Sequence, residues 1–126
     1  MSKRILVADD SKTVRSSVKY TLTKEGYDVI LAENGQDALD KLAENSSLNE
    51  RPKMIITDVN MPKMDGITFT KEVKKDRNFK FIPILILTTE SQDKMKEEGK
   101  QAGAAGWLVK PFNPEQLIGV VKKFVR

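Results

Sequence analysis

Met54-Ile55-Ile56-Thr57-Asp58, near the middle of the chain, joins a short apolar run to a carboxylate. The run is continuous rather than alternating, as suits a strand whose two faces are both covered by other elements. On either side of it, four more runs of this kind occur, at residues 5–8, 29–32, 84–87 and 107–109. Together with residues 54–57 they predict five parallel strands.

Polar segments of helical length lie between these runs. Val14, Val18 and Leu22 recur at four-residue steps before Gly26, a residue suited to a helix C-terminus. The last segment opens with Asn113-Pro114-Glu115-Gln116, which supplies an N-cap, a proline at N1 and a glutamine at N3. Further helices are expected after Asn34, from about 67 to 73 and from about 92 to 102. This alternation predicts an α/β fold, a three-layer, doubly wound parallel sheet with right-handed crossovers.

Composition narrows the possible functions. The 126 residues suit one domain (1–126), and 39% hydrophobic with 32% charged residues is typical of a folded globular protein. The chain has no cysteine and no histidine, which excludes disulfides, thiolate chemistry and imidazole as base or metal ligand. The net charge is +4, but the lysines are interleaved with acids, so no nucleic-acid partner is expected. The apolar run at residues 5–8 is too short for a signal peptide or membrane span, so we expect a cytoplasmic protein.

Polar residues directly follow the apolar runs. Asp9-Asp10 follows the first run, Asp58 the third, Thr88 the fourth and Lys110 the fifth. In open parallel sheets ligands bind outside the carboxyl ends of the strands, so these side chains should meet at one edge. Each of them alone suits a structural role, such as capping a helix.

Three acids at one edge are harder to explain by structure alone. Ser11 can cap the first helix, which leaves at least one of Asp9 and Asp10 without that role. Two like charges about 4 Å apart cost about 4 kcal/mol at an effective dielectric of about 20. The cluster therefore needs a cation, and its oxygen ligands favour Mg²⁺.

Several segments, in this order, carry a resemblance to a known family. They are Asp9-Asp10, then Asp58-Val59-Asn60-Met61-Pro62-Lys63-Met64-Asp65-Gly66, then Thr88, and finally residues 102–112 with Lys110-Pro111-Phe112 at their end. From Ile5 to about Phe124 the chain resembles the receiver domains of response regulators, especially the single-domain, CheY-like chemotaxis proteins. The resemblance implies a flavodoxin-like sheet with strand order 2-1-3-4-5. It also implies a phospho-acceptor in a two-component (phosphorelay) signal transduction system.

The resemblance further implies the roles of the site residues. Asp58 is the nucleophile that becomes phosphorylated, and Asp10 and Asp58 bind Mg²⁺ directly. Asp9 assists through water, and the backbone carbonyl of Asn60 completes the protein ligands. The phosphoryl group comes from a cognate histidine kinase. The chain itself is then no enzyme beyond self-catalysed phosphotransfer and autodephosphorylation.

Thr88 and Lys110 are implied to contact the phosphoryl oxygens, with Lys110 presented by a cis bond to Pro111. Asn60 and Glu90, two residues beyond Asp58 and Thr88, are expected to set the lifetime of the acyl phosphate. Lys110 should matter for signalling more than for folding.

The output surface is expected to comprise the fourth helix, the fifth strand and the fifth helix, which contact a downstream protein. Gly99 costs its helix about 1 kcal/mol relative to alanine, so this helix should be weakly held and able to move. Trp107 stands where the family commonly has tyrosine or phenylalanine, and Thr89 where it commonly has a small residue. Trp107 is either a switch residue or a packing aromatic. The protein is expected to be a monomer.

Rival functions share some of these residues. A haloacid-dehalogenase-like phosphatase uses a nucleophilic aspartate with Mg²⁺, but needs two acids one residue apart after its first strand, whereas Asp9 and Asp10 are adjacent. A flavodoxin-like cofactor carrier would have its bound phosphate repelled by these two carboxylates. Within the receiver family, both a stand-alone protein and a receiver cut from a longer response regulator fit, and Met1 with the ending at Arg126 favours the former.

Overall fold

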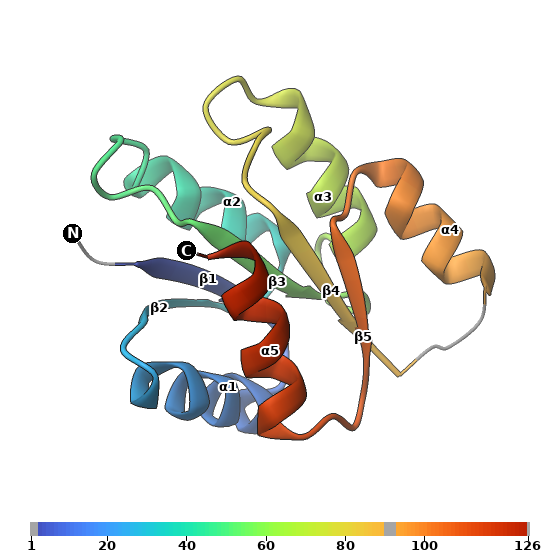
Figure 1. Ribbon diagram of the computed structural model, residues 1–126. Helices are drawn as coiled ribbons and strands as arrows, with labels where there is room; N and C mark the ends of the chain where they lie inside the picture. The colour runs from blue at the N-terminus through green and yellow to red at the C-terminus, as the bar shows by residue number, and fades with distance from the viewer. Residues whose placement is uncertain (1–2, 90–92, 126) are drawn as a thin grey trace.

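The computed structural model describes residues 3–89 and 93–125, which form one parallel sheet between two layers of helices (Figure 1). Its strands are β1 (Arg4–Ala8), β2 (Asp28–Ala32), β3 (Met54–Asp58), β4 (Ile84–Thr88) and β5 (Gly106–Val109). They pair in the order β2-β1-β3-β4-β5, and every pairing is parallel. The predicted fold and the strand order implied by the resemblance are both confirmed.

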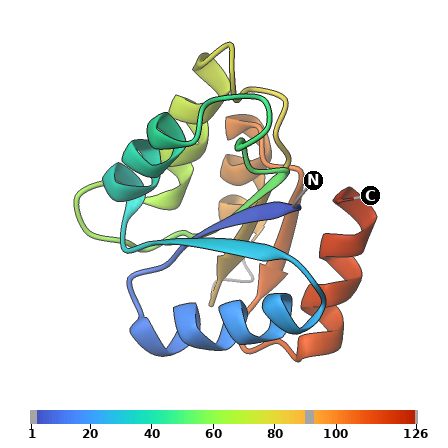
Figure 2. The ribbon, with the colours of Figure 1, turned by 90° about the vertical axis from the view of Figure 1, so that its left-hand side faces the viewer.

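The helices divide between the two faces of the sheet, as Figure 2 shows edge-on. One face carries α1 (Lys12–Lys24) and α5 (Pro114–Phe124). The other carries α2 (Gly35–Glu44), α3 (Gly66–Lys75) and α4 (Asp93–Ala102). Among the described residues, no helix is both long and apolar enough to span a bilayer.

Side chains that alternate along each strand fill the two cores. Along β1, Ile5 and Val7 join the cluster under α1 and α5, whereas Leu6 and Ala8 join the cluster under α2 and α3. All four are buried. This explains the continuous apolar runs, because each strand has to satisfy a core on both of its faces.

Short polar residues start the helices where the sequence predicts. The Ser11 hydroxyl accepts a hydrogen bond from the Val14 N–H at 3.3 Å and caps α1. Asn113 and Gln116 form a reciprocal capping box at the start of α5. Gly26 follows the end of α1 with φ +93°, a backbone conformation that favours glycine.

Helix α4 packs more closely on the sheet than its sequence suggested. Gly99 is buried, and a Cβ placed there would lie 2.9 Å from Ile86 Cδ1 and 3.0 Å from Trp107 Cζ3. Gly99 therefore also has a packing role, which the expectation of a weakly held helix did not include. The missing side chain allows the helix axis to approach β4 and β5.

Candidate functional site

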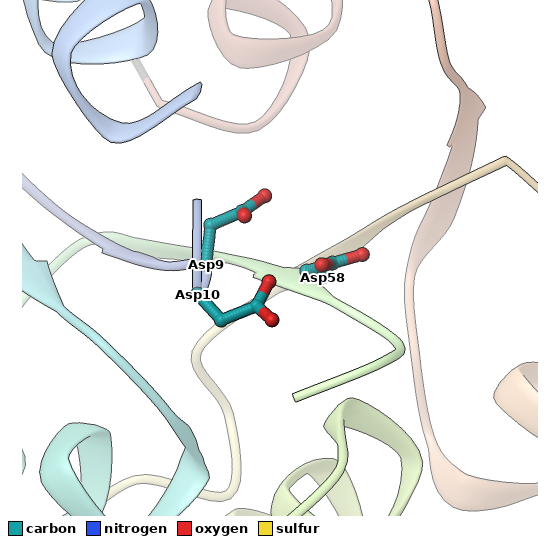
Figure 3. Close-up of side chains that lie close together, drawn as sticks. All are labelled: Asp9, Asp10 and Asp58. Carbon is teal, nitrogen blue, oxygen red and sulfur yellow. The ribbon is translucent and has the colours of Figure 1, made fainter. Parts of the chain in front are cut away.

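Three carboxylates meet at the carboxyl ends of two neighbouring strands. Asp58 is the last residue of β3, and Asp9 and Asp10 directly follow β1. Since Ala8 pairs in register with Thr57, Asp9 comes level with Asp58. One oxygen from each of the three carboxylates lies within 4.8 Å of the others, and Figure 3 shows these side chains clustered at the strand ends. Asp9 and Asp58 are buried, whereas Asp10 is exposed.

Backbone groups hold the two buried acids in place. Asp58 Oδ1 accepts a hydrogen bond from the Val59 N–H at 2.9 Å, and Asp9 Oδ1 accepts one from the Ser11 N–H at 2.9 Å. The Gly66 N–H donates to the Val59 carbonyl at 2.8 Å. A Cβ on Gly66 would overlap the carbonyl oxygen of Asp58, so the loop that follows the acceptor can close only around glycine.

Lys110 supplies the positive charge of the site. Its Nζ lies 2.9 Å from Asp9 Oδ2 and 3.4 Å from Asp58 Oδ1, and its side chain is 17% exposed. The peptide bond between Lys110 and Pro111 is cis, as the resemblance implied. Burial alone would lower the pKa of the Lys110 ammonium, but the hydrogen bond to Asp9 and the charges of Asp58 and Asp9 outweigh it and raise that pKa. Lys110 thus stays protonated between the two acids.

Asp58 lies in a less favourable electrostatic environment. Burial raises the pKa of its carboxyl, the charge of Asp9 raises it further, and Lys110 and the Val59 N–H offset part of the increase. The site therefore resists the ionised form of Asp58, which is the form that acts as a nucleophile. A second cation beside Lys110 would favour ionisation.

The remaining predicted residues lie around this cluster. Thr88 is buried at the end of β4, one residue beyond the Leu87 that pairs with Asp58. Asn60 is exposed in the loop after β3, and Thr89 is exposed after β4. Glu90 lies outside the described residues.

Trp107 lies on β5 and is half-buried against a small cluster that includes Ile86 and Ala102. Its indole Nε1 is buried and has no hydrogen-bond partner within the described part of the chain. The packing alternative for this residue therefore fits the structure, and the structure leaves its switching role a prediction.

Sequence reasoning missed Arg15, which supports the acid cluster from α1. Its Nη1 donates to the Asp9 carbonyl oxygen at 2.7 Å, and its Nη2 lies 3.8 Å from Glu33 Oε1. The signal in the sequence was a cation one helical turn after the Ser11 N-cap, on an element that begins beside the acids. Lys63 was also missed. Its φ is +66° in the loop after Asp58, a backbone conformation that is strained for a residue other than glycine.

The donor set suits a hard divalent cation. All three clustered side chains offer carboxylate oxygens, and the cluster contains no nitrogen or sulfur ligand. Such a set favours Mg²⁺ or Ca²⁺ over zinc or copper. The buried negative charge exceeds what Lys110 alone neutralises, so an acidic cation-binding pocket fits the residues present.

Comparisons with known proteins agree with this geometry. The family model described as response regulator receiver domain matches residues 5–122. The chain is similar to chemotaxis protein CheY1 of Helicobacter pylori, 43% identical over 115 residues and 90% of each chain. It is also similar to the transcriptional regulatory protein PhoP of Bacillus subtilis, 38% identical over the whole of this chain and 50% of that protein.

Solved structures show the same likeness. The high-resolution structure of Vibrio cholerae chemotaxis protein CheY4 superposes with a TM-score of 0.91 at 44% identity, covering 99% of this chain and 100% of that one. The family match does not favour the phosphatase alternative. With the acid cluster at the expected strand ends and the family model matched over residues 5–122, the chain belongs to the response regulator receiver domains, the phospho-acceptors of two-component signal transduction.

Proposed function

We propose that Asp58 is the residue of this receiver that takes the phosphoryl group from a histidine kinase. An Asp58 oxygen attacks phosphorus, a new P–O bond forms, and the bond from phosphorus to the donor nitrogen breaks. The observation that carries the proposal is that Asp58 ends the central strand β3 and has its Oδ1 3.4 Å from the Lys110 ammonium. Asp9 is fully buried and bonded to Lys110 more closely, which suits a ligand or a charge partner more than a nucleophile.

Asp10 and Asp58 would hold Mg²⁺ directly, with Asp9 acting through water and the Asn60 carbonyl as a further ligand. Bound there, the ion would neutralise charge on the phosphoryl oxygens. Exposed Asp10 is open to a hydrated ion, and buried Asp9 is already engaged by Ser11 and Lys110.

Lys110 and Thr88 would then bind the phosphoryl oxygens of the phosphorylated state. Once Asp58 carries the phosphoryl group, its oxygens compete with Asp9 for the Lys110 ammonium, which is now 2.9 Å from Asp9. The buried Thr88 hydroxyl lies one residue beyond the level of Asp58 and would donate to the same oxygens. Asn60, with Glu90, would govern how fast water hydrolyses the acyl phosphate. The chain returns to its starting state by this autodephosphorylation and needs no other catalytic activity.

Intact mass tests this proposal. The chain is incubated with acetyl phosphate and Mg²⁺, and the wild type should gain about 80 Da, the mass of one phosphoryl group. The gain should be absent for Asp58→Asn and absent for the wild type in chelator. An Asp10→Asn control should still gain the mass at saturating Mg²⁺, because it removes a ligand and not the acceptor. A gain that persists in Asp58→Asn refutes the assignment.

We propose further that α4, β5 and α5 carry the output to a downstream protein, in a monomeric receiver. The relatives named as chemotaxis proteins make chemotaxis the pathway to test first. Support comes from the contact chain that joins the site to this face. Thr88 pairs with Val109 across β4 and β5, and Trp107 of β5 lies beneath Gly99 of α4.

Beryllofluoride, a phosphoryl mimic, tests the output face. With Mg²⁺ it should change the emission of Trp107 and alter amide exchange over Asp93–Ala102 more than over Lys12–Lys24. Beryllofluoride added to Asp58→Asn is the control and should leave both unchanged. Exchange changes confined to the loop after Asp58 would contradict the proposed face while leaving the acceptor assignment intact.

A further inference from the structure

A second surface lies at the opposite end of the strands from Asp58. There the loop at residues 45–53, which leads into β3, and the loop at residues 76–83, which leads into β4, border one hollow of about 290 Å³. Both loops lie at the same end of the sheet in Figure 2. We name this surface the loop patch, and its residues are Leu48, Arg51, Lys53, Arg77 and Phe81.

The loop patch exposes large apolar side chains. Phe81 is 86% exposed and Leu48 is 76% exposed, and both line the hollow. Within residues 3–89 and 96–125, whose side chains the structure describes, the only other large apolar side chain so exposed is Tyr20 on α1. Two such side chains beside one hollow make a coherent apolar surface, unlike a scattered single residue.

The charges around this hollow are all of one sign. Arg51, Lys53 and Arg77 line it, and no carboxylate does. Lys53 and Arg77 form no ion pair within the described part of the chain. The nearest acids along the two loops have other partners, because Glu50 accepts a hydrogen bond from Ser47 and Asp76 accepts one from the Asn78 N–H.

One of these cations is already held in place. Arg51 Nη2 donates to the Ser46 carbonyl at 2.9 Å, and its guanidinium lies 5.7 Å from the centre of the Phe79 ring. An anchored arginine loses less side-chain entropy when it binds a carboxylate than a free one does. The patch therefore combines apolar area, a hollow and a preorganised positive charge.

We infer that the loop patch binds an acidic peptide segment of a partner protein, which inserts one apolar side chain into the hollow. The hollow has room for a single large side chain, and the surrounding cations match carboxylates on either side of it. Single-stranded nucleic acid fits less well. It is bound by successive stacked aromatic rings along a basic track, whereas the hollow is lined by Leu48, Ile82 and prolines, with Phe81 as its one aromatic ring.

This binding should be independent of phosphorylation. The patch precedes the first residues of β3 and β4, whereas Asp58 ends β3. The four steps from the first to the last residue of that strand span roughly 13 Å at about 3.3 Å per step. No residue of the patch belongs to the acid cluster. The inference therefore stands or falls separately from the role of Asp58.

Titration of the isotope-labelled chain, followed by amide chemical shifts, tests the inference. The probe is a short peptide of alternating glutamate and leucine. The matched probes are a lysine–leucine peptide and a glutamate–serine peptide of the same length, and a short oligothymidylate. We expect saturable shifts at the loop patch with the glutamate–leucine peptide, and affinity at least tenfold weaker with the two other peptides.

Variants locate the binding. Phe81→Ser combined with Arg77→Glu should lower the affinity for the glutamate–leucine peptide about tenfold or more. Both residues are exposed, so the fold should persist, which the unperturbed part of the spectrum reports. Tyr20→Ser combined with Lys24→Glu removes a comparable exposed aromatic and cation from α1, where the Lys24 ammonium lies 5.6 Å from the Tyr20 ring, and should leave affinity unchanged. Asp58→Asn should also leave it unchanged.

Four results would overturn the inference. They are equal shifts with the lysine–leucine peptide, affinity that survives the Phe81 and Arg77 changes, tighter binding of the oligothymidylate at the patch, and self-association of the chain through these loops. Affinity that changes severalfold in Asp58→Asn would overturn the independence from phosphorylation.

Discussion

Gly99→Ala should destabilise the protein, although alanine is the better helix former. On helix propensity alone the substitution gains about 1 kcal/mol. Its Cβ, however, would lie 2.9 Å from Ile86 Cδ1, 3.0 Å from Trp107 Cζ3 and 3.3 Å from Trp107 Cε3. Ile86 is fully buried and the indole ring is rigid, so neither neighbour yields without moving α4 or the ring.

Overpacking of a close contact costs about 1–3 kcal/mol, so the net loss in unfolding free energy should be about 1 kcal/mol. In urea, with a slope of about 2 kcal/mol per molar, the midpoint should fall by about 0.5 M. Gly119→Ala in α5 is the matched control, because a Cβ there meets nothing within 4 Å. It should raise the unfolding free energy by about 0.5–1 kcal/mol.

Urea unfolding followed by circular dichroism gives both values, and Trp107 emission in the native state reports the local shift. Emission should change in Gly99→Ala and stay unchanged in Gly119→Ala. If Gly99→Ala stabilises the protein as much as Gly119→Ala does, then α4 has room for a Cβ between Gly99 and the side chains of Ile86 and Trp107. The proposed coupling between α4 and Trp107 would then lose its steric basis.

Three further predictions concern the acid cluster. Lys110 was expected to matter for signalling more than for folding, but its ion pair with buried Asp9 gives it a part in stability as well. In chelator, Lys110→Ala should lower the unfolding free energy by about 2 kcal/mol, since it leaves Asp9 without its cation. Added Mg²⁺ should restore part of this stability in urea unfolding, and an unchanged midpoint in chelator would contradict the prediction. Burial, and then the charge of Asp9, raise the pKa of Asp58. The folded protein therefore favours the protonated carboxyl more than the unfolded chain does, and the stability that this carboxyl contributes is lost as pH rises through the folded pKa. In chelator Asp58→Asn should therefore be more stable than the wild type at neutral pH, with an advantage that shrinks as pH falls through the carboxyl range; an advantage independent of pH would argue against this cause. Asn60→Leu should slow the loss of the acyl phosphate, measured by decay of the phosphorylated mass, while the control Tyr20→Ser should lose it at the wild-type rate. Equal decay rates for the wild type and both variants would show that Asn60 does not have this role.

The sequence predicts the fold well because the runs and caps are local signals. The continuous run at residues 54–57 and the capping residues around Pro114 specify elements without knowledge of their neighbours. The position of the acid cluster also follows, since the carboxyl ends of parallel strands meet at one edge. Asp9, Asp10 and Asp58 lie together as that rule requires.

Features that depend on distances between elements could not be predicted in this way. Propensity treats Gly99 as a weak point, because it does not register that Ile86 and Trp107 come within contact of the helix. Arg15 was missed because its place one helical turn after the Ser11 N-cap does not by itself show that its guanidinium reaches the backbone carbonyl of Asp9. Lys110 was expected at the site, but its close bond to Asp9 in the unphosphorylated protein depends on where β5 ends relative to β1.

Chemical trapping of the modified residue tests the central claim most directly. The chain is phosphorylated with acetyl phosphate and Mg²⁺, then treated with borohydride, which reduces an aspartyl phosphate to homoserine and releases phosphate. Peptide sequencing by mass spectrometry then locates the homoserine. Our account predicts homoserine at residue 58 alone, with Asp9 and Asp10 unchanged. Homoserine at residue 9 or 10, with Asp58 intact, would contradict it.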